Sequence, residues 1–195
     1  ADGARIVTAS DYEVAAVWDA ATCAVMYVLN GHQSRVETAE FSKDGKKIVT
    51  ASWDGTARIF AAPTGKESLQ LPLQPPLRVV AFSPDGSRVL TASKDGQAKI
   101  SNASSGAMLL AFDHGSRVHR ANFSPDGKRV LTSSDGGPTK IFDAATGADV
   151  SAEAALPEAT EHAAYSLDRS VLASAAGNTV YIRKGAGAPA PLVAF

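Results

Sequence analysis

The chain has 195 residues, which is enough to bury a sizeable core in one or two domains. Hydrophobic residues make up 45% of it and charged residues 20%, as in ordinary globular proteins. The net charge is -1, so no overall electric field draws the chain to nucleic acid or to an anionic membrane, and we expect neither as a partner.

Cys23 is the only cysteine, which excludes an intrachain disulfide and a cysteine-based metal cluster. A disulfide-free chain favours a reducing intracellular compartment such as the cytoplasm. No apolar run approaches the roughly 20 residues that a membrane-spanning helix requires, so membrane insertion is not expected. The first five residues do not resemble a signal peptide but the middle of a repeat, which predicts that the chain is part of something longer.

Three sequence markers return along the chain at one interval. Phe41–Gly45 (FSKDG) recurs at residues 82–86 and 123–127 and, in altered form, at 165–169, with steps of 41, 41 and 42 residues. Two more markers keep this phase, and they lie at Thr8-Ala9-Ser10, Thr50-Ala51-Ser52, Thr91-Ala92-Ser93 and Thr132-Ser133-Ser134, and at Val17-Trp18-Asp19, Ile59-Phe60-Ala61, Ile100-Ser101-Asn102 and Ile141-Phe142-Asp143. Three markers in one phase indicate an internal repeat.

Turn chemistry divides each repeat into four short strands. Ser-Pro-Asp-Gly is a tight turn in which proline presets φ and glycine takes the left-handed position. The run that follows, such as 47–51, is β-branched and apolar, as in a buried strand. An Asp-Gly hairpin turn and a second Gly-containing turn then delimit the third and fourth strands. Helical periodicity is absent, and Pro157 and the repeat phase argue against a helix in the Ala-rich stretch 152–164.

Repeated units of four antiparallel strands are typical of radially stacked β-propeller blades. On these markers the chain resembles the WD-repeat β-propeller family over nearly its whole length. The resemblance implies an all-β fold of about five four-stranded antiparallel blades, whose strands run from a at the central channel to d outside. In chain order we expect b, c and d near 4–10, 13–18 and 24–29; a to d near 36–42, 46–52, 56–61 and 66–71; a to d near 78–83, 87–93, 97–102 and 107–112; a to d near 118–124, 128–134, 138–143 and 148–152; and a to d near 160–166, 170–175, 178–183 and 190–195.

The whole chain is expected to be a single, partial propeller. Its blades are predicted at residues 1–30 (strands b to d only), 31–72, 73–113, 114–154 and 155–195. Seven blades are usual in this family, so we expect a larger ring to which further blades contribute. A closed ring of five, with another segment or a partner subunit filling the gap, is the second choice.

Family members often carry a hydrogen-bonded set of His, Ser or Thr, Asp and Trp in each blade. The second blade comes closest, with His32, Ser52 and Asp54 but Phe60 in the tryptophan position. No blade is complete. The first blade keeps Trp18 but has Tyr12 in the aspartate position, and the fourth has His114 and Ser134 with the acidic residue shifted to Asp135 and Phe142 in the tryptophan position. The fifth blade has lost the set, since Gly177 and Arg183 occupy the aspartate and tryptophan positions. Stability is therefore expected to come mainly from apolar packing between blades.

The b–c and d–a turns are expected to share one rim of the propeller, which is our candidate interaction surface. Its candidate residues are Tyr12, His32, Arg35, Trp53, Lys94, His114 and Arg117. The repeat does not require an aromatic residue at Trp53, and exposed Trp, Tyr and Arg are enriched at binding hot spots. The alternative is that Trp53 folds over its own turn and the arginines are simply solvated.

No motif for chemistry accompanies these residues. His32 and His114 are interpreted as hydrogen-bonding residues within their blades, because no Cys or second His lies at zinc-ligand spacing. His119 and His162 fall near the channel-side strands. The sequence contains no Gly-x-Ser-x-Gly elbow and no phosphate-binding glycine loop, and its Asp-Gly pairs are turn formers rather than a calcium loop. No catalytic residue, cofactor or metal is predicted.

The sequence thus favours a non-catalytic scaffold or structural subunit that binds other proteins through the propeller rim or the outer blade edges. This hypothesis rests in part on the family resemblance, since a fold does not by itself specify a function. A second hypothesis is the propeller domain of a larger enzyme, such as a kinase or peptidase fusion. A third is a module that recognises a modified peptide or a small ligand in the channel.

Overall fold

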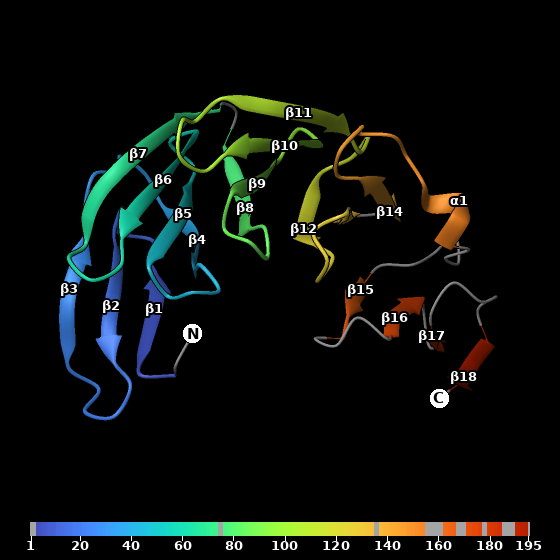
Figure 1. Ribbon diagram of the computed structural model, residues 1–195, viewed down its shortest axis with the longest axis horizontal. Helices are drawn as coiled ribbons and strands as arrows, with labels where there is room; N and C mark the ends of the chain where they lie inside the picture. The colour runs from blue at the N-terminus through green and yellow to red at the C-terminus, as the bar shows by residue number, and fades with distance from the viewer. Residues whose placement is uncertain are drawn as a thin grey trace.

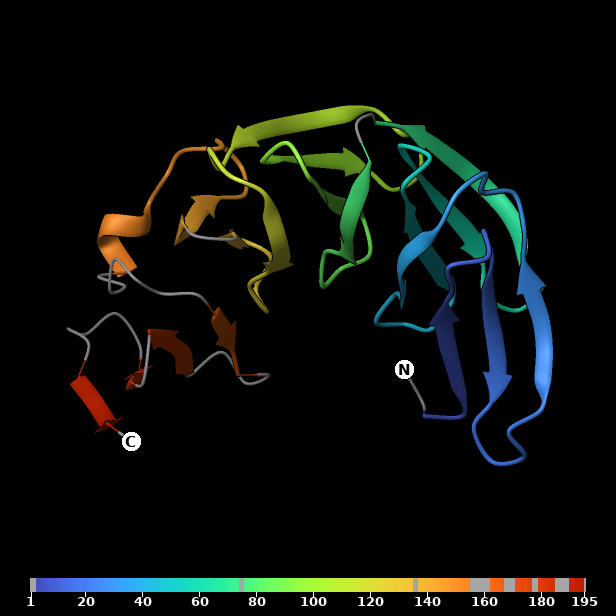
Figure 2. The same cartoon turned by 180° about the vertical axis from the view of Figure 1, so that it is seen from behind.

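The computed structural model describes residues 3–73, 76–134, 137–154, 162–166, 171–176, 179–184 and 190–194, and they form five antiparallel sheets. The sheets fan around a common centre, with β4, β8 and β12 innermost (Figures 1 and 2). In chain order they comprise β1 (Arg5–Ala9), β2 (Ala15–Asp19) and β3 (Val25–Leu29); β4 (Val36–Phe41), β5 (Lys47–Ser52), β6 (Thr56–Ala61) and β7 (Lys66–Pro72); β8 (Leu77–Phe82), β9 (Arg88–Ser93), β10 (Gln97–Asn102) and β11 (Met108–Asp113); β12 (Val118–Phe123), β13 (Arg129–Ser134) and β14 (Gly137–Asp143); and β15 (His162–Tyr165), β16 (Val171–Ala176), β17 (Thr179–Lys184) and β18 (Ala190–Ala194). The all-β, blade-like fold class is confirmed, while the number of blades in a complete ring stays a prediction.

The outer strand expected at 148–152 is replaced by other structure. Asp149 makes an isolated bridge to Phe142, and Ser151–Ala154 forms the one-turn helix α1. The Asp149 carboxylate accepts the Ser151 backbone N–H at 2.9 Å, which offers this segment a local alternative to a strand ladder. Alanine also favours helix over strand. The expectation that 152–164 contains no helix is therefore wrong at residues 152–154, while 155–161 lie outside the described residues.

The Ser-x-Asp-Gly turns close the inner hairpins as predicted. In the first, Ser42 Oγ donates to Asp44 Oδ1 at 2.6 Å and accepts the Lys47 backbone N–H at 2.9 Å. The same bonds recur at Ser83–Asp85 and Ser124–Asp126. The glycine that ends each turn has a φ of +69°, a backbone conformation that residues other than glycine rarely adopt.

The second and third sheets each pack against a neighbour on both faces, because alternate side chains of a strand point to opposite sides. In β5, Ile48 joins a buried cluster with Val17 and Leu29 of the first sheet. The next residue, Val49, joins a cluster with Leu77 and Phe82 of the third sheet. This two-sided burial explains why the b strands are apolar at successive positions rather than at alternate ones.

Arginine side chains also link successive sheets. Arg88 at the start of β9 donates to the Ala144 and Gly127 carbonyl oxygens of the fourth sheet at 2.9 and 2.6 Å, and its guanidinium lies 5.1 Å from the centre of the Phe123 ring. Arg5 makes the equivalent bonds from the first sheet to the second, onto Ala62 and Gly45, and lies over Phe41. The sequence markers gave no sign of these links, since donor and acceptor lie 39 to 57 residues apart.

We predict that Arg88→Met lowers the free energy of unfolding of the full-length protein by about 1–3 kcal/mol, because two buried carbonyl oxygens lose a charged donor. Chemical denaturation monitored by circular dichroism measures this change. Lys128→Met is the matched control, since Lys128 lies exposed in the adjacent turn. Equal stability of the two variants would contradict a linking role for Arg88.

Candidate functional site

The b–c turns and d–a connections share one rim, as expected, because backbone hydrogen bonds join them. The Trp53 N–H donates to the Arg35 carbonyl at 3.0 Å, and the Lys94 N–H donates to the Pro76 carbonyl at 3.3 Å. The connection into one sheet also touches the preceding one, since the Val36 N–H donates to the Ser10 carbonyl at 3.0 Å. Side chains from neighbouring sheets are thereby brought to one surface.

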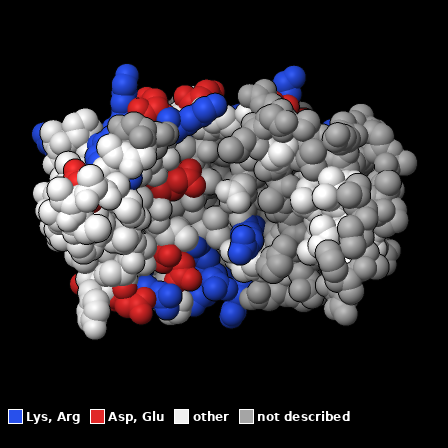
Figure 3. All heavy atoms as spheres, turned by 90° about the horizontal axis from the view of Figure 1, so that it is seen from below, with Lys and Arg blue, Asp and Glu red and all other residues white. Residues whose placement is uncertain are grey.

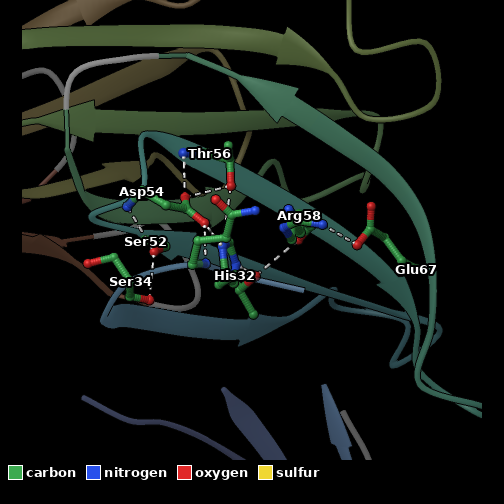
Figure 4. Close-up of polar contacts among 9 residues, drawn as sticks. His32, Ser34, Ser52, Asp54, Thr56, Arg58 and Glu67 are labelled. Carbon is green, nitrogen blue, oxygen red and sulfur yellow. Dashed lines mark hydrogen bonds and ion pairs between the residues drawn. The ribbon is translucent and has the colours of Figure 1, made fainter. Parts of the chain in front are cut away.

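A buried hydrogen-bond network underlies this rim in the second sheet (Figure 4). His32 Nδ1 lies 2.8 Å from Asp54 Oδ2, and His32 Nε2 lies 2.7 Å from Thr50 Oγ1. The hydroxyl partner is thus Thr50 and not Ser52, which corrects the sequence-based expectation. Ser52 Oγ instead donates to the Ser34 carbonyl and accepts the Asp54 backbone N–H, both at 3.0 Å.

The ionisation of Asp54 defines which way these protons point. Burial raises the pKa of Asp54, but hydrogen bonds from Thr56, the Gln33 backbone N–H and His32 outweigh it and lower that pKa to about 2. An ionised carboxylate can only accept, so His32 Nδ1 carries the proton. Burial in turn lowers the pKa of His32, so the ring is neutral and its Nε2 accepts from the Thr50 hydroxyl.

Gly31 leaves room for the side chains of Arg58 and Glu67 beside this network. Its φ is +125°, and a Cβ atom there would come within 2.9 Å of Arg58 Nη1. Arg58 is buried and paired with Glu67 at 2.6 Å on the outer strand of the same sheet. Glycine at position 31 therefore avoids a clash with this ion pair and adopts a positive φ that other residues rarely adopt.

His114 occupies the corresponding place in the fourth sheet. Its Nδ1 lies 2.7 Å from Thr132 Oγ1, so Thr132 and not Ser134 is again the hydroxyl partner. Burial, and next the charge of Lys140, lower the pKa of His114. Both His32 and His114 are buried, with exposed fractions of 6% and 3%, so the prediction that they belong to a contact surface is corrected. Asp135, Gly177 and the side chains of His162 and Arg183 lie outside the described residues.

Trp53 is the centre of a cluster that does reach the surface. Its indole N–H donates to Glu37 Oε2 at 3.0 Å, and 36% of the residue is exposed. Lys94 Nζ lies 3.1 Å from the centre of the indole ring, and the Arg35 guanidinium carbon lies 5.3 Å from it. Such cation–π contacts hold the ring at the surface instead of over its own turn. The structure thus brings three of the seven predicted rim residues into contact.

Charged groups from four sheets surround this tryptophan. Arg35 Nε lies 2.9 Å from both Asp11 Oδ1 of the first sheet and Glu37 Oε2. Arg78 of the third sheet lies 3.7 Å from Glu37 Oε1. Desolvation, followed by the charges of Arg117 of the fourth sheet and Arg78, lowers the pKa of Lys94. We call Asp11, Arg35, Glu37, Trp53, Arg78, Lys94 and Arg117 the rim cluster.

Tyr12 is 85% exposed in the turn between β1 and β2. Its backbone N–H donates to Ser10 Oγ at 3.0 Å. Tyr12 follows Asp11 of the rim cluster in the chain. It therefore extends the same rim over the first sheet.

Three bulges in the innermost strands place residues on the inner wall; His119 was expected near the channel, whereas Glu37 and Arg78 were missed by the sequence analysis. The pairing of β4 with β5 skips Glu37, that of β8 with β9 skips Arg78, and that of β12 with β13 skips His119. A bulge redirects a side chain out of the alternating pattern. These three residues line a hollow of about 380 Å³ together with Glu40 and Arg120. Burial raises the pKa of Glu40, which accepts the Phe82 N–H at 3.1 Å.

The hollow and the rim cluster are continuous, because Glu37 and Arg78 belong to both. Figure 3 looks into the open side of the arc, where acidic and basic side chains lie on the inner wall and charged side chains of both signs gather at the upper and lower ends. Among the described residues, no group of three His, Cys, Asp or Glu side chains could hold a metal ion. In the same part of the chain, no helix has the length and apolarity needed to cross a bilayer.

We predict that the free energy of unfolding of the full-length protein decreases as the pH falls below about 6.5, the ordinary histidine value. His32 and His114 have lowered pKa values in the fold, so the unfolded chain binds protons first. Each contributes at most about 1.4 kcal/mol per pH unit, and the loss ends at the folded pKa. Urea denaturation at a series of pH values measures the slope. His32→Gln should reduce the slope, and an unchanged slope in both this variant and His114→Gln would contradict the assignment.

Comparison with known sequences gives the chain a family context. The family model described as "WD domain, G-beta repeat" matches residues 23–60, 74–101 and 107–137. The first match runs from the outer strand β3 of the first sheet to β6 of the second, so the sequence repeat overlaps two adjacent sheets.

Curated relatives match shorter segments. The chain is 47% identical over 51 residues to guanine nucleotide-binding protein subunit beta-2 of Caenorhabditis elegans, over 26% of this chain and 14% of that protein. It is 38% identical over 64 residues to ribosome assembly protein 4 of Chaetomium thermophilum, over 32% of this chain and 12% of that protein. Human coronin-7 is 31% identical over 68 residues, over 34% of this chain and 7% of that protein. The matches thus span less than one sixth of the length of each relative.

Proposed function

The chain belongs to the WD-repeat β-propeller family, and we propose that it is a non-catalytic protein-interaction scaffold that binds a partner through the rim cluster. A protein-interaction role in general is supported by the family match and by relatives named as a subunit of a guanine nucleotide-binding protein and as a ribosome assembly protein. Use of the rim in this particular chain is our proposal.

One observation carries the proposal, namely that Trp53 is held at the surface by charged groups of its own sheet and of the next one. Arg35 and Glu37 lie on its own sheet, and Lys94 comes from the next. A large aromatic ring that is fixed in place loses little conformational entropy when a partner covers it. Tryptophan and arginine are also the residues most enriched among interface hot spots.

The outer blade edges are the competing surface. Val25 and Met26 of β3 and Met108 and Leu109 of β11 are about half exposed or more. These side chains lie at the outer edges of two sheets that are separated by β7, where polar residues alternate with Leu69 and Leu71. The apolar positions are therefore divided, whereas the rim cluster is a single surface.

We also propose that a further blade packs on the exposed apolar face of the first sheet. Val7 and Ala9 of β1 pack towards the second sheet, while Ile6 and, on β3, Met26 and Val28 are exposed. These exposed positions alternate with the packed ones, so they lie on the opposite face of the first sheet. Additional blades of the same polypeptide, or a partner subunit, would bury this apolar face as the other sheets bury theirs.

Affinity purification of the tagged full-length protein tests the scaffold proposal. We expect at least one protein to co-purify with the wild type and Trp53→Ala to reduce its recovery about tenfold or more, because a hot-spot side chain contributes at least about 2 kcal/mol. Met108→Ala is the matched control, which removes a large exposed side chain from an outer edge. Loss of the partner with Met108→Ala instead would favour the edges, and absence of any co-purifying protein would contradict the scaffold function.

A further inference from the structure

We propose that the rim cluster docks an acidic segment of the partner protein, one that presents several Asp or Glu carboxylates around an apolar contact with Trp53. This inference rests on the proposed function and names the chemistry of the partner. Its support comes from the charges of the cluster, from the geometry that holds them in place and from the exposure of their existing ion pair.

Positive charge predominates around Trp53. The cluster holds four cationic side chains, namely Arg35, Arg78, Lys94 and Arg117, against the two carboxylates of Asp11 and Glu37. The whole chain carries a net charge of -1, so this excess is local to the cluster. A surface of one sign attracts a segment of the opposite sign and accelerates its association.

Glu37, the less exposed of the two carboxylates in the cluster, is already paired with donors of the cluster. Glu37 accepts the indole N–H of Trp53 at 3.0 Å and the Arg35 Nε at 2.9 Å, and it lies 3.7 Å from Arg78. The Glu37 carboxylate is therefore shared among Trp53, Arg35 and Arg78, and its charge is not available to Lys94 exclusively. An incoming carboxylate would find Lys94, whose ammonium group lies over the same indole ring as the Arg35 guanidinium.

The second carboxylate can be exchanged for one from a partner. The Arg35–Asp11 pair is open to solvent, with side-chain exposed fractions of 44% and 71%. Exposed pairs of this kind contribute little stability, about 0–1 kcal/mol, so Arg35 can turn to another acid at small cost. The arginine guanidinium group can also donate two parallel hydrogen bonds to one carboxylate.

The arrangement fits a protein segment better than a nucleic acid. The cationic groups gather around one tryptophan, and the carboxylates of Asp11 and Glu37 lie between them. These carboxylates would repel a continuous phosphate backbone. Basic nucleic-acid surfaces usually extend as a stripe on a basic domain, whereas this chain has a pI near 6.5. Spaced carboxylates with an intervening apolar side chain match both the cations and the ring.

The test measures binding of a short labelled peptide to the full-length protein by fluorescence anisotropy. The peptide carries glutamate at every third position and one leucine, and its counterpart carries glutamine instead of glutamate. We expect the glutamate peptide to bind more tightly and its affinity to fall with added salt. Lys94→Glu should weaken binding at least about tenfold, because it replaces attraction by repulsion. Lys46→Glu, the same charge change on the opposite rim, should have little effect.

Lys94→Met keeps the apolar stem over the ring without the charge, and we expect an intermediate loss; circular dichroism checks that each variant is folded. Equal affinity of the two peptides, no binding of either, or equal effects of Lys94→Glu and Lys46→Glu would overturn the proposal. Tighter binding of single-stranded oligothymidylate through Lys94 would replace it by nucleic-acid recognition. A co-purifying partner that depends on Trp53 but not on Lys94 would leave the scaffold function intact while refuting the acidic segment.

Discussion

The face-to-face packing of neighbouring small sheets is the interaction on which the rest of the structure depends. A sheet of three or four strands has too little buried surface to be stable alone. The buried clusters accordingly span pairs of sheets, as with Val49 and Leu77 between the second and third and Phe112 and Phe142 between the third and fourth. Every rim or inner-wall residue takes its position from this stacking.

The polar networks refine that packing but do not replace it. His32, Asp54 and Thr50 form a complete buried chain of hydrogen bonds without a tryptophan, since Phe60 fills that position in the apolar cluster. In the first sheet the reverse holds, because the Trp18 indole N–H donates to Thr8 Oγ1 at 2.9 Å in a sheet without the histidine. Different blades can therefore lose different members of the set and still stack.

Sequence reasoning succeeded where a feature is local or periodic. The interval between the Phe41 and Phe82 markers located the sheets, and the Ser-x-Asp-Gly turns formed as predicted. Thr50 was mistaken for Ser52 because residues two apart share one face of a strand, so the sequence alone does not say which hydroxyl reaches the histidine.

Long-range and irregular features escaped for physical reasons. The Arg88 links depend on acceptors in another sheet, and the helix α1 depends on local capping by Asp149. The rim position of Trp53, Arg35 and Lys94 was foreseen because turns of one kind share a rim. The contacts of Arg35 and Lys94 with the Trp53 ring could not be predicted from the sequence. Neither could the presence of Glu37 and Arg78 in the cluster, because these residues lie at bulges that no sequence marker indicates.

The repeated bulge has a consequence for orientation. Glu37, Arg78 and His119 occupy the same place in three successive repeats, yet they are an acid, a strong base and an imidazole. A backbone with near rotational symmetry would, with identical side chains, offer a guest several equivalent poses. Three different side chains make these poses inequivalent, so a molecule that enters the hollow can match their order in only one orientation around the axis.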